Sequence, residues 1–159
     1  MATATIYASA GDGEIRGPSA NVSWSANRSA STGSSKDDTS TQAFGCYASN
    51  NAGDWSTYAM ARGYLPFDLS SIPGTATITA IDLVIKPYAE WHGSGGSMCV
   101  CSSSQASLTA LATSDWGNAG TTEYVTSRPA FSSFTAGTYK TLALNAAGVA
   151  AATVGASGK

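Results

Sequence analysis

Alternating apolar and polar side chains mark the clearest β-strand of the chain. In residues 77–86, Ile81, Leu83 and Ile85 fall on one face of an extended strand, because successive side chains of a strand point to opposite sides. Polar and charged side chains occupy much of the other face. Pro87 follows at once and supplies no hydrogen-bond donor to a sheet. The pattern therefore predicts a half-buried strand that ends at Pro87.

The preceding residues 62–69 alternate in the same way. Their apolar face consists of Leu65, Phe67 and Leu69. Pro66 lies within this stretch, which predicts an edge position or a bulge there. Residues 70–75 carry a Pro-Gly pair, which is typical of the centre of a type II turn. We expect the strands on either side of this turn to form a hairpin or a corner.

Six further stretches have the pattern and composition of strands. They are residues 3–9, 21–25, 42–48, 97–102, 123–126 and 139–145. Residues 146–152 predict one or two helical turns, and residues 28–41, which have almost no apolar side chains, predict an exposed loop. Many short strands between Gly- and Ser-rich turns are typical of a sandwich. We therefore predict an all-β fold, a two-sheet antiparallel β-sandwich of jelly-roll type with long Ser/Gly-rich loops, formed as a single domain by residues 1–159.

Composition and charge narrow the class of protein further. Charged residues make up 11% of the chain, against roughly 25% in an ordinary soluble domain. The eight lysines and arginines are scattered from Arg16 to Lys159, which argues against a nucleic-acid partner because phosphate binding needs clustered cations. No apolar run reaches the roughly 20 residues of a membrane span, and residues 1–6 lack the pattern of a secretory signal. We expect neither a transmembrane segment nor a signal peptide.

Three cysteines are present, which is an odd number for a disulfide framework. Cys99 and Cys101 would point to the same face of a strand and are badly placed to bond to each other. Cys46 could pair with one of them across strands, but we favour the interpretation that all three are small buried apolar residues. A zinc site is disfavoured because His92 is the single histidine and there is no fourth cysteine.

Three tryptophans in polar, glycine-rich contexts are candidates for sugar binding. Sugars stack their apolar faces on aromatic rings while their hydroxyl groups bond to neighbouring carboxylates and amides. The candidate carbohydrate-binding residues are Trp55, Trp91 and Trp116, with Asp54, Asp115 and Asn118 as polar partners. The competing interpretation is that each tryptophan covers an end of the core, which is the commoner role. Trp24 falls within the predicted strand 21–25 and is assigned to the core.

Candidate cofactor and catalytic groups are few. Calcium is the one cofactor that the loop acids suggest, as a structural ion held by Asp12, Asp54 and Asp115, although no EF-hand-like spacing supports it. Glu90, His92 and Ser94 contain the side-chain types of a triad. Neighbours on a glycine-rich loop are not held in relay geometry, so we reject this grouping. We therefore predict no catalytic residues and a protein that is not an enzyme.

The central part of the chain resembles a known family. Residues 62–74, Arg-Gly-Tyr-Leu-Pro-Phe-Asp-Leu-Ser-Ser-Ile-Pro-Gly, and residues 78–83 resemble the "R-x-hydrophobic-x-F-D-x-S-x-I-P" and "I-x-x-A-x-L" signatures of DNRLRE-type β-sandwich domains. Such domains occur in surface proteins and phage proteins. Residues 12–15 match the "D-G-x-I" opening of these domains, and residues 114–118 and 138–148 look like later segments of the phage-associated versions. These motifs are structural and not catalytic.

The chain also departs from that family. The Asp-Asn-Arg-Leu-Arg-Glu string is absent, and the final lysine-x-glycine-leucine-arginine strand of such domains has no counterpart before Lys159. Either the sequence is cut short or the closing strand comes from another molecule. The single domain is then one that lacks its last strand at the C-terminus.

The resemblance implies a non-enzymatic module on a virion or an extracellular surface. It would be a phage virion component, in a tail, a fibre or a capsid decoration, that assembles with neighbouring subunits as a homo-oligomer or contacts the host surface. The alternative is a carbohydrate-binding module of a secreted or cell-surface protein, whose partner would be a glycan. A hydrolase has only coincidental residue groupings in its favour.

Overall fold

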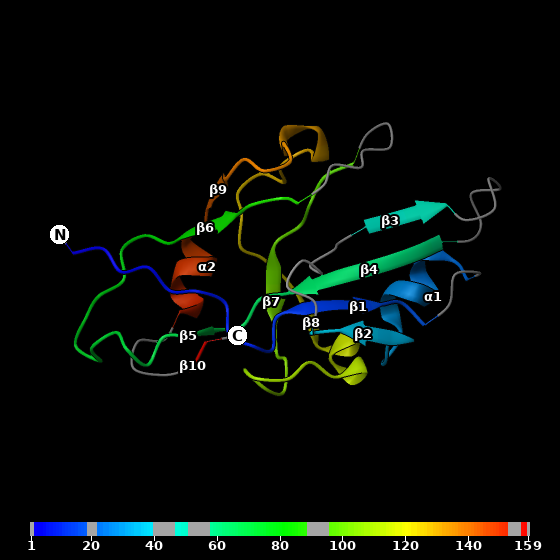
Figure 1. Ribbon diagram of the computed structural model, residues 1–159, viewed down its shortest axis with the longest axis horizontal. Coiled ribbons are helices and arrows are strands. Elements are labelled where there is room, and N and C mark those ends of the chain that lie inside the picture. Colours follow the sequence, from blue (N-terminus) through cyan, green and yellow to red (C-terminus); the bar gives the residue numbers. More distant parts are fainter. Residues whose placement is uncertain are drawn as a thin grey trace.

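Short antiparallel strands dominate the fold. The computed structural model describes residues 2–18, 22–39, 47–50, 58–88, 96–152 and 157–158. Within them, one sheet has four strands in the order β2-β1-β4-β3 and three further sheets have two strands each (Figure 1). The four strands are β1 (Gly13–Arg16), β2 (Ser35–Asp37), β3 (Tyr47–Asn50) and β4 (Tyr58–Tyr64). The predicted dominance of antiparallel β-structure is confirmed.

The four-stranded sheet is centred on β1, which pairs with β2 on one side and β4 on the other. Ile15 of β1 lies opposite Lys36 and Arg62 and is fully buried. Its side chain belongs to a core cluster that also contains Met60, Tyr64, Leu111 and Trp116. The helix α1 (Trp24–Ser29) contacts β4, and its first turn is capped by Ser23, whose hydroxyl accepts from the Ala26 N–H.

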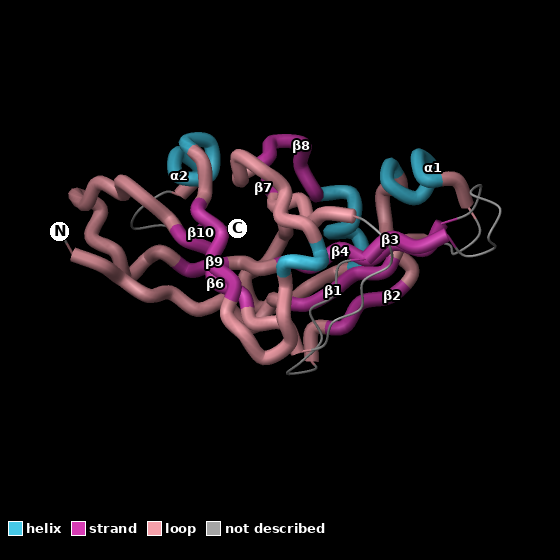
Figure 2. Tube along the Cα trace, turned by 90° about the horizontal axis from the view of Figure 1, so that it is seen from above, coloured by secondary structure: helices cyan, strands magenta, loops and turns pink. Residues whose placement is uncertain are grey.

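A second core includes residues of the sheet formed by β6 (Asp82–Ile85) and β9 (Lys140–Ala143), which is one of three two-stranded sheets. The other two pair β5 (Phe67–Asp68) with β10 (Ser157–Gly158) and β7 (Cys101–Ser103) with β8 (Ala119–Glu123). The buried members of this core are Met98, Val125, Phe134 and Leu142. Two 3-10 helices, η1 (Thr113–Asn118) and η2 (Phe131–Ser133), and the helix α2 (Ala146–Ala151) complete the described elements. Figure 2 shows α1 and α2 at opposite ends of the molecule, with much of the chain between them in loops.

Several predictions from the alternation of side chains are confirmed. Ile81, Leu83 and Ile85 are partly buried while the residues between them are exposed, although the paired strand covers only Asp82–Ile85. Residues 139–145 contain β9, and residues 146–152 contain α2, whose N-cap Asn145 accepts from the Gly148 N–H. Alternation and capping side chains are local signals, so they survive in the folded chain.

Two strand predictions are wrong because a local feature overrides the apolar pattern. Residues 21–25 do not form a core strand, since Ser23 caps a helix that starts at Trp24, and Trp24 is 42% exposed. Residues 62–69 are not one strand, because the chain breaks after Tyr64 and resumes as β5 in another sheet. Pro66, which cannot donate to a ladder, lies in this break.

Of the hairpin or corner predicted at residues 70–75, the hairpin is wrong. The strand β5 pairs with β10 and β6 pairs with β9, so the two flanking strands never meet. A turn is present, but the Ala76 N–H donates to the Pro73 carbonyl, which makes Pro73 its first residue. Gly74 is not among the glycines with positive φ, as the third residue of a type II turn would be.

The remaining predicted strands are shorter or displaced. Residues 3–9 contain one isolated bridge, from Ala8 to Phe67, and residues 97–102 contain a bridge at Ser97 and the start of β7. Residues 123–126 contain the end of β8 and a bridge at Val125. Of residues 42–48, the first five lie outside the described residues and the last two begin β3. The predicted loop 28–41 includes β2, because backbone pairing with β1 needs no apolar side chains.

The cysteine interpretation is wrong for Cys99, which is exposed, while Cys101 is half-buried; both are free thiols. Cys46 lies outside the described residues. Burial raises the pKa of the Cys101 thiol, and the neighbouring Cys99 adds to the increase. Among the described residues, the helices are too short or too polar for any of them to cross a membrane.

Gly17 marks a point where backbone and side chain approach closely. A Cβ atom at this position would overlap the side-chain amide of Asn27, which is fully buried. The glycine itself is held in place, because its N–H donates to the Met60 carbonyl (2.8 Å) and its carbonyl accepts from the Ser34 hydroxyl (2.7 Å).

We therefore expect Gly17→Ala to lower the free energy of unfolding by about 1–3 kcal/mol, the usual cost of inserting a methyl group into a packed site. Gly74→Ala is the matched control, because a Cβ at Gly74 meets no atom within 4 Å. Urea denaturation of both variants measures the difference. Equal stability of the two variants would contradict the packing at Gly17.

Candidate functional site

The sequence singled out two groups of candidate site residues, and the structure describes part of each. Asp115, Trp116 and Asn118 lie together in η1. Trp55, Trp91 and Asp54 lie outside the described residues, as do Glu90, His92 and Ser94. The geometry can therefore be assessed for the η1 group and for Asp12.

Trp116 is a core residue and not a sugar platform. Its side chain is fully buried, and its indole N–H donates to the Asn27 carbonyl at 3.0 Å. The guanidinium carbon of Arg62 lies 4.1 Å from the ring centroid and covers one face of the ring. The proposal that Trp116 stacks on a carbohydrate is therefore wrong, because the indole has no open face.

Arg62 joins three separate parts of the chain at this point. Besides stacking on Trp116, it donates one hydrogen bond to the Trp116 carbonyl and another to the Arg28 carbonyl at 2.8 Å. A planar guanidinium suits this double role, because it stacks on an aromatic face while its edge donates. The side chain thus ties β4 to η1 and to α1.

Asp115 organises the loop before it. One carboxylate oxygen accepts from the Ala106 N–H and from the Asn118 side-chain amide, both at 3.0 Å, and the other accepts from the Ala112 N–H at 2.9 Å. Both oxygens of this fully buried carboxylate are therefore engaged by protein donors. The calcium-ligand prediction for Asp115 is corrected accordingly, and Asn118 is a structural partner of Asp115.

The rest of the calcium prediction has no support in the described part of the chain. Asp12 is half-buried at the start of β1, and Asp54 is outside the described residues. Within the ranges that the structure describes, no three His, Cys, Asp or Glu side chains are grouped as metal ligands.

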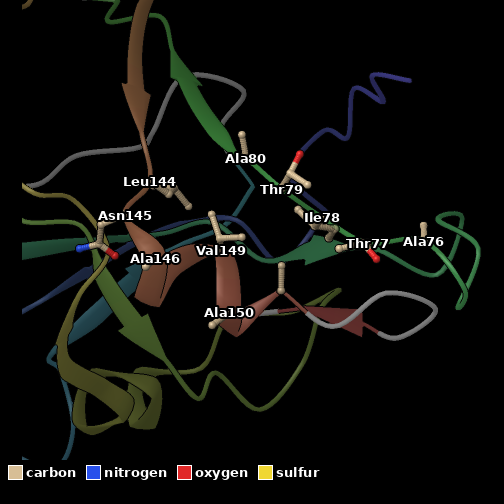
Figure 3. A pocket seen from close by; sticks show the side chains of 11 residues that line it. Ala76, Thr77, Ile78, Thr79, Ala80, Leu144, Asn145, Ala146, Val149 and Ala150 are labelled. Atoms are coloured by element: carbon tan, nitrogen blue, oxygen red, sulfur yellow. The ribbon is translucent and has the colours of Figure 1, made fainter. Parts of the chain in front are cut away.

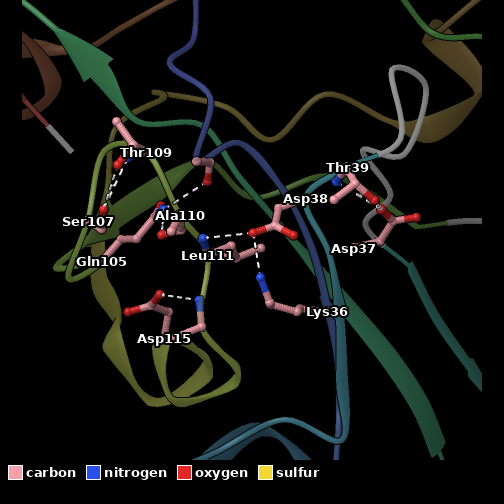
Figure 4. Close-up of polar contacts among 12 residues, drawn as sticks. Lys36, Asp37, Asp38, Thr39, Gln105, Ser107, Thr109, Ala110, Leu111 and Asp115 are labelled. Carbon is pink, nitrogen blue, oxygen red and sulfur yellow. Dashed lines mark hydrogen bonds and ion pairs between the residues drawn. The ribbon is translucent and has the colours of Figure 1, made fainter.

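Further polar contacts hold the segment 104–118, which we call the anchored loop, against the N-terminal part of the chain (Figure 4). The buried Gln105 amide donates to the Gly11 carbonyl at 2.8 Å. Asp38 accepts from the Leu111 N–H at 3.1 Å and from the Lys36 ammonium. The bond from Lys36, followed by the one from Leu111, lowers the pKa of the Asp38 carboxyl. The anchored loop is thus held mainly by side-chain acceptors and donors.

Sequence reasoning missed the residues that matter most here. Gln105 and Asn27 carry no local signal, since a polar residue in a Ser-rich stretch looks the same whether it is buried or exposed, and Arg62 entered only as the first residue of a family signature. The Tyr64 hydroxyl donates to the Asp115 carbonyl at 2.9 Å and completes the cluster. We call Arg62, Tyr64, Asp115 and Trp116 the polar clamp.

A groove of about 670 Å³ lies elsewhere, between the segment 76–80 and α2 (Figure 3). Among the described residues that line it, none is charged. Its apolar lining includes Ile78, Leu144 and Val149, and its polar groups come from threonines and Asn145. The groove is the candidate interaction site of the described residues, because the segment that forms one of its sides is itself largely exposed.

Exposed tyrosines form a further surface feature. Tyr139 is 70% exposed and has the Lys86 ammonium 5.3 Å from its ring centroid. Tyr7, in the N-terminal segment, is 83% exposed.

Comparison with protein-family models, with curated proteins and with solved structures found no match to this chain. Its function is therefore inferred from its own residues and geometry.

The role of Asp115 as an anchor predicts a specific loss of stability. In Asp115→Asn, an amide NH₂ replaces one acceptor oxygen and faces a backbone N–H, so we expect the free energy of unfolding to fall by about 2–3 kcal/mol. Asp82→Asn is the control, because Asp82 is exposed on β6. Urea denaturation at neutral pH compares them, and an unchanged midpoint for Asp115→Asn would refute the anchor role.

The polar clamp also predicts a pH dependence. Burial raises the pKa of Tyr64 to about 12, above the value of about 10 for an unfolded tyrosine. The folded state therefore keeps a proton that the unfolded state loses, so this contribution to stability is fully present below pH 10 and is lost as the pH rises through 12. Between pH 9 and 11, the wild type should lose about 1 kcal/mol more stability than Tyr64→Phe. Equal losses in urea denaturation at the two pH values would contradict this assignment.

Proposed function

We propose that the chain is a non-enzymatic structural module of a phage virion, in a tail, a fibre or a capsid decoration, located on the virion or at an extracellular surface. In this proposal it assembles with neighbouring subunits, including copies of itself, or contacts the host surface. The two cores described above would be parts of one jelly-roll-like sandwich. The likeness of residues 62–83 to the DNRLRE-type domains supports this choice of class.

One observation carries the proposal: an exposed segment with strand-forming residues lies without a sheet partner beside the groove. Residues 76–80 pair with no strand among the described residues, and all of them except Ile78 are exposed. Natural proteins usually cover or charge an open edge, because it is a template for pairing with another chain. This edge carries no charge and lies beside an uncharged groove, as expected of a surface that a neighbour covers.

Carbohydrate binding is the second candidate function. Its candidate surface is the one around Tyr139 and not the one around Trp116. Tyr139, with the Lys86 ammonium over its ring, has an exposed aromatic side chain and a polar partner. Such a pair offers a stacking face and a hydrogen-bond donor to a sugar. Trp55 and Trp91 stay predictions for the same role.

The native mass of the protein separates these functions. Light scattering across a dilution series at fixed ionic strength should find an oligomer that persists at low protein concentration. A monomer at every concentration would sink assembly between copies. The carbohydrate candidate would then be tested by glycan binding of Tyr139→Ala, Trp55→Ala and Trp91→Ala, in which loss of binding by any variant identifies the ring that stacks.

A further inference from the structure

Two segments of this chain have strand-forming sequences and no sheet partner within the described structure. The first is residues 2–7, Ala-Thr-Ala-Thr-Ile-Tyr, which we call the arm. The second is residues 76–80, Ala-Thr-Ile-Thr-Ala, which we call the open edge. The arm leaves the body at Ala8, which bridges to Phe67, and the Ser9 N–H donates to the Pro66 carbonyl. Neither segment belongs to a ladder with any described strand.

The arm does not fill the groove of its own copy. Residues 2–5 are exposed and Tyr7 is 83% exposed. Figure 1 shows the arm lying away from the four-stranded sheet, toward the point marked N. One side of the groove is formed by the open edge, and the arm of the same copy leaves the groove uncovered.

The two segments match each other in length and pattern. Five paired residues of an antiparallel strand extend about 17 Å, and both segments are long enough for this. If Ile6 of the arm lies beside Ile78, the threonines of the arm lie beside Thr77 and Thr79 of the open edge, because side chains alternate along both strands. Cross-strand threonine pairs and β-branched pairs stabilise a sheet.

The lack of charge in the arm and in the groove indicates which segment occupies the groove. The arm contains no charged residue, and none lines the groove, so the contact has neither a charge to desolvate nor like charges to repel. A charged partner would have no counter-charge here. A second copy of this chain supplies a segment that is uncharged, strand-forming, of the right length and unpaired in its own molecule.

We infer that the arm of one copy adds as an antiparallel strand to the open edge of a second copy and covers the groove of that copy. This inference rests on the proposed assembly function and names its contact. Reciprocal exchange of arms closes a dimer, whereas one-way exchange continues as a filament. In both cases the backbone donors of residues 77–80 gain partners that they lack within the described part of the single copy, whereas the Ala76 N–H already donates to the Pro73 carbonyl.

Two variants remove the two sides of the contact. The double variant Thr79→Pro, Ala80→Pro removes two adjacent backbone N–H donors from the open edge. Adjacent N–H groups of a strand point to opposite sides, so one of the two lost donors is on the side that faces the arm. Proline keeps the segment extended. Deletion of residues 2–7 removes the arm. Thr79→Ala is the matched control because it keeps the backbone N–H. Far-ultraviolet circular dichroism and the urea midpoint establish that each variant is folded, and Thr5→Pro replaces the deletion if the shortened chain is unstable.

At a concentration where the wild type is oligomeric by light scattering, we expect the double proline variant and the arm deletion to be monomers and Thr79→Ala to stay oligomeric. Mixing the two monomeric variants should then restore a heterodimer, because one supplies an intact arm and the other an intact edge. An oligomer that survives either loss, or a mixture that stays monomeric, overturns the exchange while leaving assembly standing. A monomeric wild type overturns both the exchange of arms and the assembly between copies.

Discussion

The stack of the Arg62 guanidinium on the Trp116 indole is the interaction on which the rest of the core around Ile15 depends. It places a permanently charged group flat against a buried ring, and its edge hydrogens reach two backbone carbonyls, of Trp116 and Arg28. Three elements that are distant in sequence, α1, β4 and η1, are fixed by this one side chain. With η1 in place, Asp115 is held where its carboxylate can serve the backbone of the anchored loop.

The anchored loop shows how a chain with few charges and short strands becomes ordered. Buried backbone N–H and carbonyl groups need partners, and irregular segments do not supply them through a ladder. Here Asp115, Asp38 and Gln105 supply them as side chains, in bonds of 2.8–3.1 Å to backbone atoms. Asp115, which first suggested a metal or a sugar, therefore satisfies the protein's own backbone.

The sequence predicted what depends on local pattern and failed where a distant contact decides. The alternation around Leu83 and the helical turns predicted at residues 146–152 are local, and both are found. The fate of Trp116 is not local, because an Asp-Trp-Gly-Asn stretch has the same appearance whether Arg62 covers the ring or a sugar does. The strand β2 was missed because its pairing with β1 rests on backbone groups and not on apolar side chains.

The strand predictions for residues 3–9 and 77–81 failed for a different reason. There the residues are strand-forming, yet the described structure gives them almost no partner, so local preference and tertiary structure disagree. Folded sequences usually agree across these levels, and places where they do not tend to serve function. Both disagreements occur in uncharged segments, one of which lines the groove. A partner strand from a second copy would remove both at once, whereas pairing with an unrelated protein would leave the arm unexplained.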